Sequence, residues 1–384
     1  MSNNTKKPAG LFDLEGISCV SFNKDFTQVA LSKKDSFVYI YQVIDFMNPD
    51  SWKLLHKLDA HVQYVSGIDW CHATNRLLTC SYDKTSYVWD FDGTKWIQSN
   101  VVVTTKLGFL CCKWNKRGDK FCEGTSAKNL IIGYFNTESK WWMGVGVKEV
   151  KSSDKNSSDK NSSDKIHKTN IHKSSVVCCE IDPNSLFVLS GSTDLRVIVS
   201  SCYLKEVDDA YLTEETKPMA QKFGEVIYSF KANCWINSVA WSNDGNYGFA
   251  AGQNAIVSVI DYKNNKHDEI KCTHSPVTII IPNGPNGFFA VCYDRNIVEY
   301  EKTEEGWVLK RTVTTSGKVE GAAKGNVGGA LKKFEAMGQQ KKENLAVTTK
   351  QFAYLHKSNI SSCHIKDKDV ITTDVTGFIK YWKL

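Results

Sequence analysis

The residues of this chain whose types and spacing could do chemistry are histidine–aspartate pairs. His61 precedes Asp83 by 22 residues, and His172 precedes Asp194 by the same interval. A buried pair of this kind can act as the general base that activates a nucleophile. The alternative is a hydrogen-bonded network that stiffens a repeated structural unit.

The recurrence of these pairs favours the structural alternative. The same order returns with His274 and Asp294, and with His356 and Asp374, at intervals of 20 and 18 residues. A catalytic pair is needed once, whereas a stiffening network is needed in every unit of a repeat. Two tryptophans complete the predicted network, Trp89 and Trp382.

Familiar catalytic and cofactor motifs are missing from the sequence. The glycine-rich segment 321–329 lacks the Lys-Ser/Thr pair of a phosphate-binding loop, and neither H-E-x-x-H nor G-x-S-x-G occurs. His167 and His172 are five residues apart, which is weak evidence for a metal. The 13 cysteines include no C-x-x-C and stand mostly among apolar residues, which is typical of reduced, buried thiols. The sequence therefore predicts no enzyme, no cofactor and no metal.

The elements that position the histidines form a repeat. It is clearest at 61–91, where the strand-like runs VSGIDW, RLLTCS and SYVWDF are separated by polar turns. The same pattern returns at 17–41, 109–135, 172–202, 235–262, 274–301 and 356–382. Seven units of three or four strands predict an all-β, seven-bladed propeller, in which each blade packs on two neighbours. We expect the segment 11–15, LFDLE, to supply the outer strand of the last blade.

Three inserts interrupt the repeat within this single predicted domain. Residues 148–168 contain SSDKNSSDKNSSDK, which has no apolar residue and predicts a disordered loop. Residues 203–230 form a polar connection between blades that ends in an outer strand, GEVIYSF. Residues 302–355 begin with the outer strand of blade six and continue as a Gly/Ala/Lys-rich tether.

The last insert also carries a predicted amphipathic helix over 330–342. Leu331, Phe334 and Met337 fall on one helical face, and Lys332 and Lys333 lie mostly elsewhere. Such a helix on a tether can dock into a groove on a partner, fold back on the propeller or lie on a membrane surface. The short apolar stripe disfavours the membrane.

A second candidate contact is the pair Trp141 and Trp142 on a predicted outer strand. One ring should face the blade and the other the neighbouring surface. The exposed ring could anchor a partner, and a packed blade edge is the alternative.

Charge and hydropathy argue against a nucleic-acid-binding protein, a membrane-spanning protein and a secreted protein. The net charge of +6, from 48 basic and 42 acidic residues, is too small to indicate nucleic-acid binding by itself. No apolar run reaches the ~18 residues of a membrane span, and the N-terminus MSNNTKKPAG lacks the apolar core of a signal peptide.

Several segments, in the same order, resemble one family of WD-repeat proteins. ISCVSFNKDFTQVAL and VSGIDWCHATNRLLTCSYDKTSYVW resemble its first two blades, and YFNTESKWWMGVGVKE resembles the exit from its third. KFGEVIYSF, KANCWINSVAWSNDG and the long insert before LHKSN are similar to its later blades and protruding helix. The family is the WD-repeat subunit (subunit 1) of the actin-related protein 2/3 complex.

This resemblance implies a non-catalytic scaffold in a hetero-oligomeric, cytoplasmic assembly that nucleates branched actin filaments. Partners would be actin, actin-related proteins and other small subunits, and the helix would contact one of them through Leu331, Phe334 and Met337. The SSDKN expansion and the Gly-rich tether depart from the family pattern.

Two alternative functions stay open. One alternative is a scaffold of a nuclear or chromosome-associated assembly. Another is a propeller enzyme with a site in its channel, for which we expect no acids or metal ligands in register.

Overall fold

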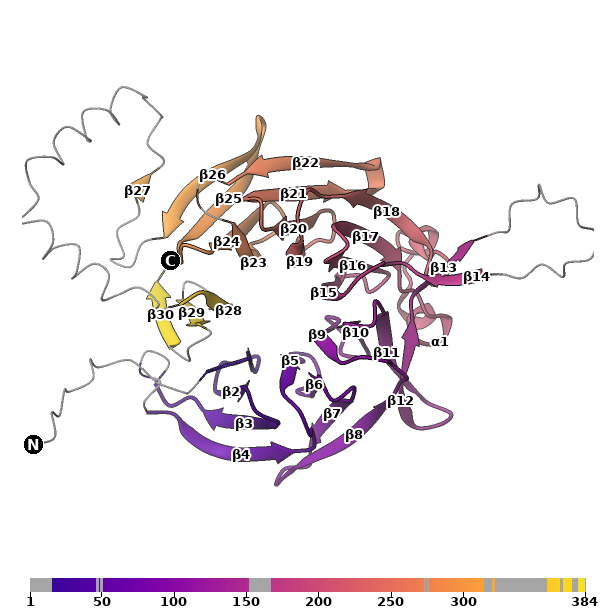
Figure 1. The fold of residues 1–384 in the computed structure, drawn as a ribbon, viewed down its shortest axis with the longest axis vertical. Helices are drawn as coiled ribbons and strands as arrows, with labels where there is room; N and C mark the ends of the chain where they lie inside the picture. Colours follow the sequence, from indigo (N-terminus) through magenta and orange to yellow (C-terminus); the bar gives the residue numbers. More distant parts are fainter. Residues whose placement is uncertain are drawn as a thin grey trace, which may run out of the picture.

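The structure is a ring of β-sheets around a central axis, with short helical turns on its outside (Figure 1). It is a computed structural model that describes residues 16–45, 48, 51–151, 167–272, 274, 276–313, 320–321, 358–366, 369–374 and 379–383. In this described part of the chain, no helix combines the length and the apolar composition that crossing a lipid bilayer requires. The predicted all-β propeller fold is confirmed.

The repeated unit is a sheet of four consecutive antiparallel strands, which we call a blade. The first blade consists of β1 (Cys19–Phe22), β2 (Gln28–Ser32), β3 (Phe37–Gln42) and β4 (Lys53–Asp59). The second consists of β5 (Val65–Trp70), β6 (Leu77–Ser81), β7 (Ser86–Phe91) and β8 (Trp96–Val102). The third consists of β9 (Phe109–Trp114), β10 (Lys120–Thr125), β11 (Leu130–Asn136) and β12 (Trp141–Gly146).

The later blades repeat this order. The fourth consists of β15 (Val176–Ile181), β16 (Phe187–Ser192), β17 (Arg196–Ser201) and β18 (Val226–Lys231). The fifth consists of β19 (Ile236–Trp241), β20 (Gly248–Gly252), β21 (Ile256–Asp261) and β22 (Lys266–Lys271). The sixth consists of β23 (Val277–Pro282), β24 (Gly287–Cys292), β25 (Ile297–Thr303) and β26 (Gly306–Val313), extended by β27 (Glu320–Gly321). The last consists of β28 (Ile360–Lys366), β29 (Asp369–Asp374) and β30 (Ile379–Lys383).

The position of each strand in its blade follows from its apolar pattern. The second strands, such as β6 (LLTCS) and β10 (KFCEGT), are buried along their whole length because a neighbouring blade covers each face. Outer strands such as β4 (KLLHKLD) and β8 (WIQSNVV) carry polar and exposed residues. The core of the protein is therefore divided into apolar layers between blades.

Those layers run around the whole ring. Each innermost strand contacts the innermost strand of the next blade, and β28 contacts β1. Phe22 and Val29 of the first blade share one apolar cluster with Ile371 and Ile379 of the last. The ring therefore closes on itself, as the burial of both faces of every blade requires. The predicted blade count of seven and the strand at 11–15 stay predictions, and the latter segment lies outside the described residues.

One seam of the ring differs from the others. The outer strands β8 and β12 pair in parallel, with Trp142 opposite Val101 and Met143 opposite Val102. This short ladder joins the second and third blades into one eight-stranded sheet.

The inserts differ in detail from their predicted forms. The ends of the predicted loop 148–168 are ordered strands, β13 (Lys148–Lys151) and β14 (His167–Asn170), which pair with each other. The prediction of a loop throughout is wrong there, because backbone pairing needs no apolar side chain. The 203–230 connection contains short helical turns before its predicted outer strand β18: α1 (Lys205–Asp208), η2 (Asp209–Tyr211) and η3 (Lys217–Met219). One further turn, η4 (Tyr262–Asn264), precedes β22.

Candidate functional site

The predicted His–Asp network is complete in the second blade. His61 Nδ1 lies 3.2 Å from the Asp83 carboxylate, and His61 Nε2 lies 2.9 Å from Thr79 Oγ1. Trp89 Nε1 donates to the same hydroxyl at 2.9 Å. The side chains of His61 and Asp83 are both almost fully buried. This arrangement ties the loop before β5 to the strands β6 and β7.

Other blades repeat the network in part. His172 lies 3.2 Å from Asp194 and 2.8 Å from Ser190 Oγ, whereas the pair His274–Asp294, also at 3.2 Å, is partly exposed. Asp374 is buried in β29. His356 and the side chain of Trp382 lie outside the described residues. The repetition is that of a structural device, since each copy lies inside its own blade.

This network predicts a dependence of stability on acid. Burial raises the pKa of Asp194, but hydrogen bonds from His172 and from the backbone N–H groups of Lys173 and Arg196 outweigh it and lower the pKa to about 2. A carboxyl whose pKa is lower in the folded state stabilises above its unfolded pKa and loses that contribution as pH falls through the folded value. Asp194→Asn should therefore lower the free energy of unfolding at pH 6, and this deficit should shrink from about pH 4 towards about pH 2. Urea titrations at successive pH values test this, with Asp268→Asn on exposed β22 as the control. A deficit that does not change with pH would contradict the assignment.

The two tryptophans of β12 have opposite environments. Trp142 is buried and packs against Trp114, Phe121 and Phe135. Trp142 cannot be a partner-binding residue, and that prediction is wrong because its ring fills the core between the second and third blades. Trp141 is 54% exposed, as successive side chains of a strand point to opposite faces.

Trp141 lies in an apolar area on the outer rim of the third blade. A surface hollow of about 420 Å³ is lined by Val102, Trp141, Met143 and the turn residues Asn136, Glu138 and Ser139. Val145 is also exposed on this face of β12, whereas Phe135, which is also exposed, pairs with Trp142 and lies on the opposite face. The other predicted contact residues, Leu331, Lys332, Lys333, Phe334 and Met337, lie outside the described residues.

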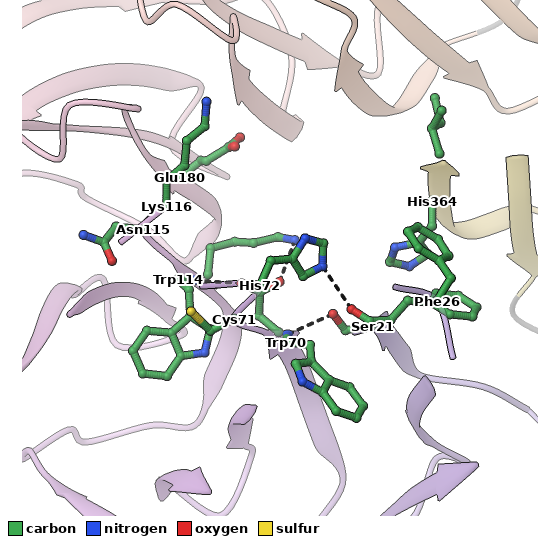
Figure 2. A pocket seen from close by; sticks show the side chains of 14 residues that line it. Ser21, Phe26, Trp70, Cys71, His72, Trp114, Asn115, Lys116, Glu180 and His364 are labelled. Carbon is green, nitrogen blue, oxygen red and sulfur yellow. Dashed lines mark hydrogen bonds and ion pairs between the residues drawn. The ribbon is translucent and has the colours of Figure 1, made fainter. Parts of the chain in front are cut away.

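Sequence reasoning missed a cavity of about 320 Å³ at the central channel (Figure 2). Asp69, Lys113, Glu180 and His364 line it, each from the innermost strand of a different blade. The expectation that no acids stand in register is therefore wrong. Alignment of VSGIDW, FLCCKW, VVCCEI and ISSCHI would have found them, because each residue precedes the last residue of its motif.

The charges in this cavity largely neutralise each other. Lys113 Nζ lies 3.0 Å from the Asp69 carboxylate, which also accepts the backbone N–H of Trp114 at 2.8 Å. Burial raises the pKa of Glu180 to about 7 and lowers the pKa of His364 to about 3. Among the described residues, no group of three His, Cys, Asp or Glu side chains is arranged to hold a metal ion. The geometry is that of an ion pair at the wall of the channel, with Lys113 half-exposed, beside a weakly acidic carboxyl group.

A second feature that sequence reasoning missed is a buried ion cluster between the third and fourth blades. Lys120 is fully buried, and its ammonium donates to Asp208 at 2.7 Å and to the carbonyl oxygens of Ser185 and Cys202. Arg117 donates to the other oxygen of Asp208. Asp208 ends α1, so the cluster fastens the 203–230 connection to the ring.

The fold and the in-blade networks define a class, that of the WD-repeat β-propellers. The family pattern described as "WD domain, G-beta repeat" matches residues 52–90, 163–199 and 224–261. The first and third ranges include the outer strand of the preceding blade, and the first two include the histidines and aspartates of the second and fourth blades.

Within the class of WD-repeat β-propellers, the known proteins that the chain resembles share one description. The chain is 32% identical over 251 residues to actin-related protein 2/3 complex subunit 1A of Arabidopsis thaliana, a match that covers 64% of this chain and 59% of that protein. It is 27% identical over 386 residues to subunit 1A-A of Xenopus laevis, covering 97% and 95% of the two chains. It is 23% identical over 305 residues to subunit 1 of Schizosaccharomyces pombe, covering 76% and 72%. These matches, together with the WD repeats, support membership of the family of WD-repeat proteins that comprises subunit 1 of this complex. It spans 59% of the length of its Arabidopsis relatives, and these relatives are named as complex subunits rather than as enzymes.

Proposed function

We propose that the chain is a non-catalytic scaffold subunit of an actin-related protein 2/3 complex. The observation that carries this proposal is the match to subunit 1A-A of Xenopus laevis along 97% of the chain. The closed ring supports it, because blades packed on both sides form a rigid body with a large rim that can hold several partners in fixed positions. The complex would be cytoplasmic and would nucleate branched actin filaments.

The rim offers one exposed anchor, and the long insert offers another. Trp141 stands on the outer surface of the third blade, and aromatic anchors of this kind dominate the energetics of many interfaces. We assign actin binding to the segment 330–342, through Leu331, Phe334 and Met337, with Lys332 and Lys333 facing acidic surface on the partner.

The role of the insert predicts the effect of one substitution. Phe334→Asp should leave the propeller folded and weaken one partner contact by about 2 kcal/mol or more, because a charge replaces the central apolar anchor. Binding of the purified variant to actin and to the other subunits measures this, together with filament nucleation. Gln339→Asp is the matched control, since it adds the same charge on the opposite face of the helix that the sequence predicts. If both variants bind like the parent chain, the segment has no such role.

Affinity purification of the full chain followed by mass spectrometry tests the proposed function itself. Recovery of actin-related proteins together with the other small subunits is the expected result. The alternative is a WD-repeat scaffold of a nuclear or chromosome-associated assembly, for which chromatin proteins would be recovered in place of the actin-related proteins. That outcome would overturn the proposal.

A further inference from the structure

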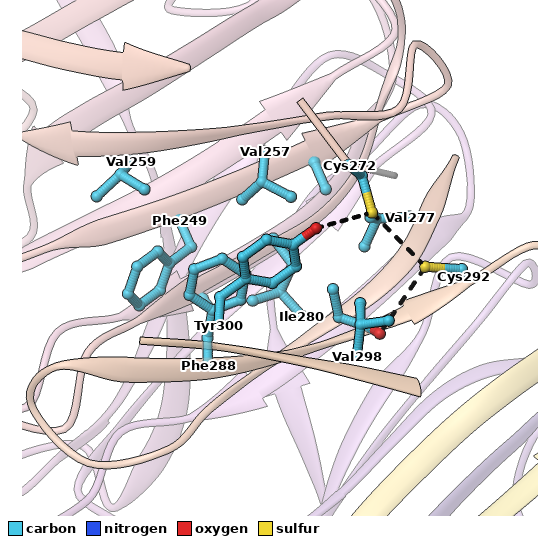
Figure 3. Packing of buried hydrophobic residues seen from close by; sticks show 13 residues of the cluster. Phe249, Val257, Val259, Cys272, Val277, Ile280, Phe288, Cys292, Val298 and Tyr300 are labelled. Carbon is cyan, nitrogen blue, oxygen red and sulfur yellow. Dashed lines mark hydrogen bonds between the residues drawn. The ribbon is translucent and has the colours of Figure 1, made fainter. Parts of the chain in front are cut away.

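Two cysteines meet at the junction of the fifth and sixth blades (Figure 3). Cys272 directly follows the outer strand β22, and Cys292 ends β24. Their sulfur atoms are 3.9 Å apart, although 20 residues separate them in the chain. They lie in the apolar cluster that holds these two blades together.

A third residue distinguishes Cys272 from its neighbour. The hydroxyl of Tyr300 donates a hydrogen bond to Cys272 Sγ at 3.2 Å. The hydrogen bond between Cys272 and Cys292 and that from Tyr300 lower the pKa of Cys272 below its ordinary value, although burial opposes them. The thiolate is the reactive form of cysteine, so Cys272 is the nucleophile of the pair. Cys272 also keeps 5% of its surface exposed, whereas Cys292 is fully enclosed.

We propose that Cys272 and Cys292 are an oxidation site, at which hydrogen peroxide converts the two thiols into a disulfide. The Cys272 thiolate attacks one peroxide oxygen, the O–O bond breaks, and hydroxide leaves to be protonated to water. The resulting sulfenic acid is then attacked by the sulfur of Cys292, which forms the S–S bond and releases a second water. Two thiols are oxidised and one peroxide is reduced to two waters. The disulfide would link the connection that enters the sixth blade to that blade's second strand.

A second close pair in the chain provides the comparison. Cys111 and Cys179 are 3.6 Å apart at the junction of the third and fourth blades, closer than Cys272 and Cys292. Contacts with Cys111 and Cys122, together with burial, raise the pKa of Cys179 well above its ordinary value. The two sulfur atoms are therefore close in both pairs. What distinguishes Cys272 is the hydrogen bond that its sulfur accepts from the hydroxyl of Tyr300. If proximity alone decided reactivity, Cys111 and Cys179 would react first.

The test is oxidation of the folded full-length chain by hydrogen peroxide. After alkylation of the remaining thiols, peptide mapping without reductant should find Cys272 linked to Cys292, with the loss of two hydrogens, before any link between Cys111 and Cys179. Tyr300→Phe should slow the linkage several-fold. Cys292→Ser should instead leave Cys272 as a sulfenic acid that dimedone traps, which keeps the test valid if the Tyr300 variant does not fold. Cys111→Ser should leave the linkage rate unchanged.

Other outcomes would overturn the proposal. They are a first link at Cys111–Cys179, an unaltered rate in a folded Tyr300→Phe variant, or no dimedone adduct on Cys272 in Cys292→Ser. The readout is chemical and needs no partner, so it is independent of the function proposed above.

Discussion

Asp208→Ala is expected to lower the free energy of unfolding by about 3–5 kcal/mol, the cost of leaving a buried charge without its partner. The Lys120 ammonium is fully buried, and its three hydrogen bonds go to Asp208 and to two backbone carbonyl oxygens. After the substitution its positive charge would lose its only directly hydrogen-bonded carboxylate among the described residues and would keep the carbonyl oxygens and Cys202 Sγ as hydrogen-bond acceptors, in a medium of low polarity. Arg117, which is the less buried cation of the cluster, would also lose its ion pair with the Asp208 carboxylate.

Urea or thermal unfolding of the purified variant measures this loss. Glu206→Ala, an exposed residue of the same short helix α1, is the control and should change stability by less than about 0.5 kcal/mol. Lys120→Met should cost less than Asp208→Ala, because it removes the buried charge and leaves Asp208 with Arg117. If the substitutions of Asp208 and Glu206 lowered the free energy of unfolding by equal and small amounts, Asp208 would not be the partner that stabilises the buried Lys120.

Trp142→Ala is expected to destabilise the protein by about 3–5 kcal/mol, as for other large-to-small substitutions of buried aromatic residues. The ring lies between Trp114 and Phe135 and also contacts Phe121, so its removal leaves a cavity that these rigid rings cannot close. Denaturant unfolding followed by tryptophan fluorescence measures the change.

The adjacent residue supplies the control for this prediction. Trp141→Ala deletes the same side chain from the solvent-facing side of β12 and should change stability by less than about 1 kcal/mol. It should instead weaken recovery of a partner if the rim hollow is an interface. Equal losses of stability in the two variants would mean that the strand is not oriented as described.

Features that repeat could be predicted from the sequence. The propeller fold and the pairing of His61 with Asp83 follow from a pattern that several blades share. The opposite environments of Trp141 and Trp142 follow from the alternation of side chains along a strand. Which of the two rings is buried could not be predicted, because that depends on how the third blade faces the second.

Features that depend on long-range contacts were missed. Lys120 and Asp208 are 88 residues apart, and each belongs to a polar sequence that is typical of a surface. The channel residues Asp69, Lys113 and Glu180 differ in type, so a search for repeated chemistry does not find them. They are found only when the blades are aligned and the same position is compared across them.

The parallel ladder between β8 and β12 has a mechanical consequence. Two outer strands form a backbone ladder across that seam. The other described sheets are separate, and between them the backbone contributes isolated hydrogen bonds, such as that from Val65 N–H to the carbonyl oxygen of Asp35. Under a pulling force, or in the first stage of melting, the second and third blades should move as one double-width segment. The ring should then split open at another junction, and this pair of blades should exchange its amide hydrogens last.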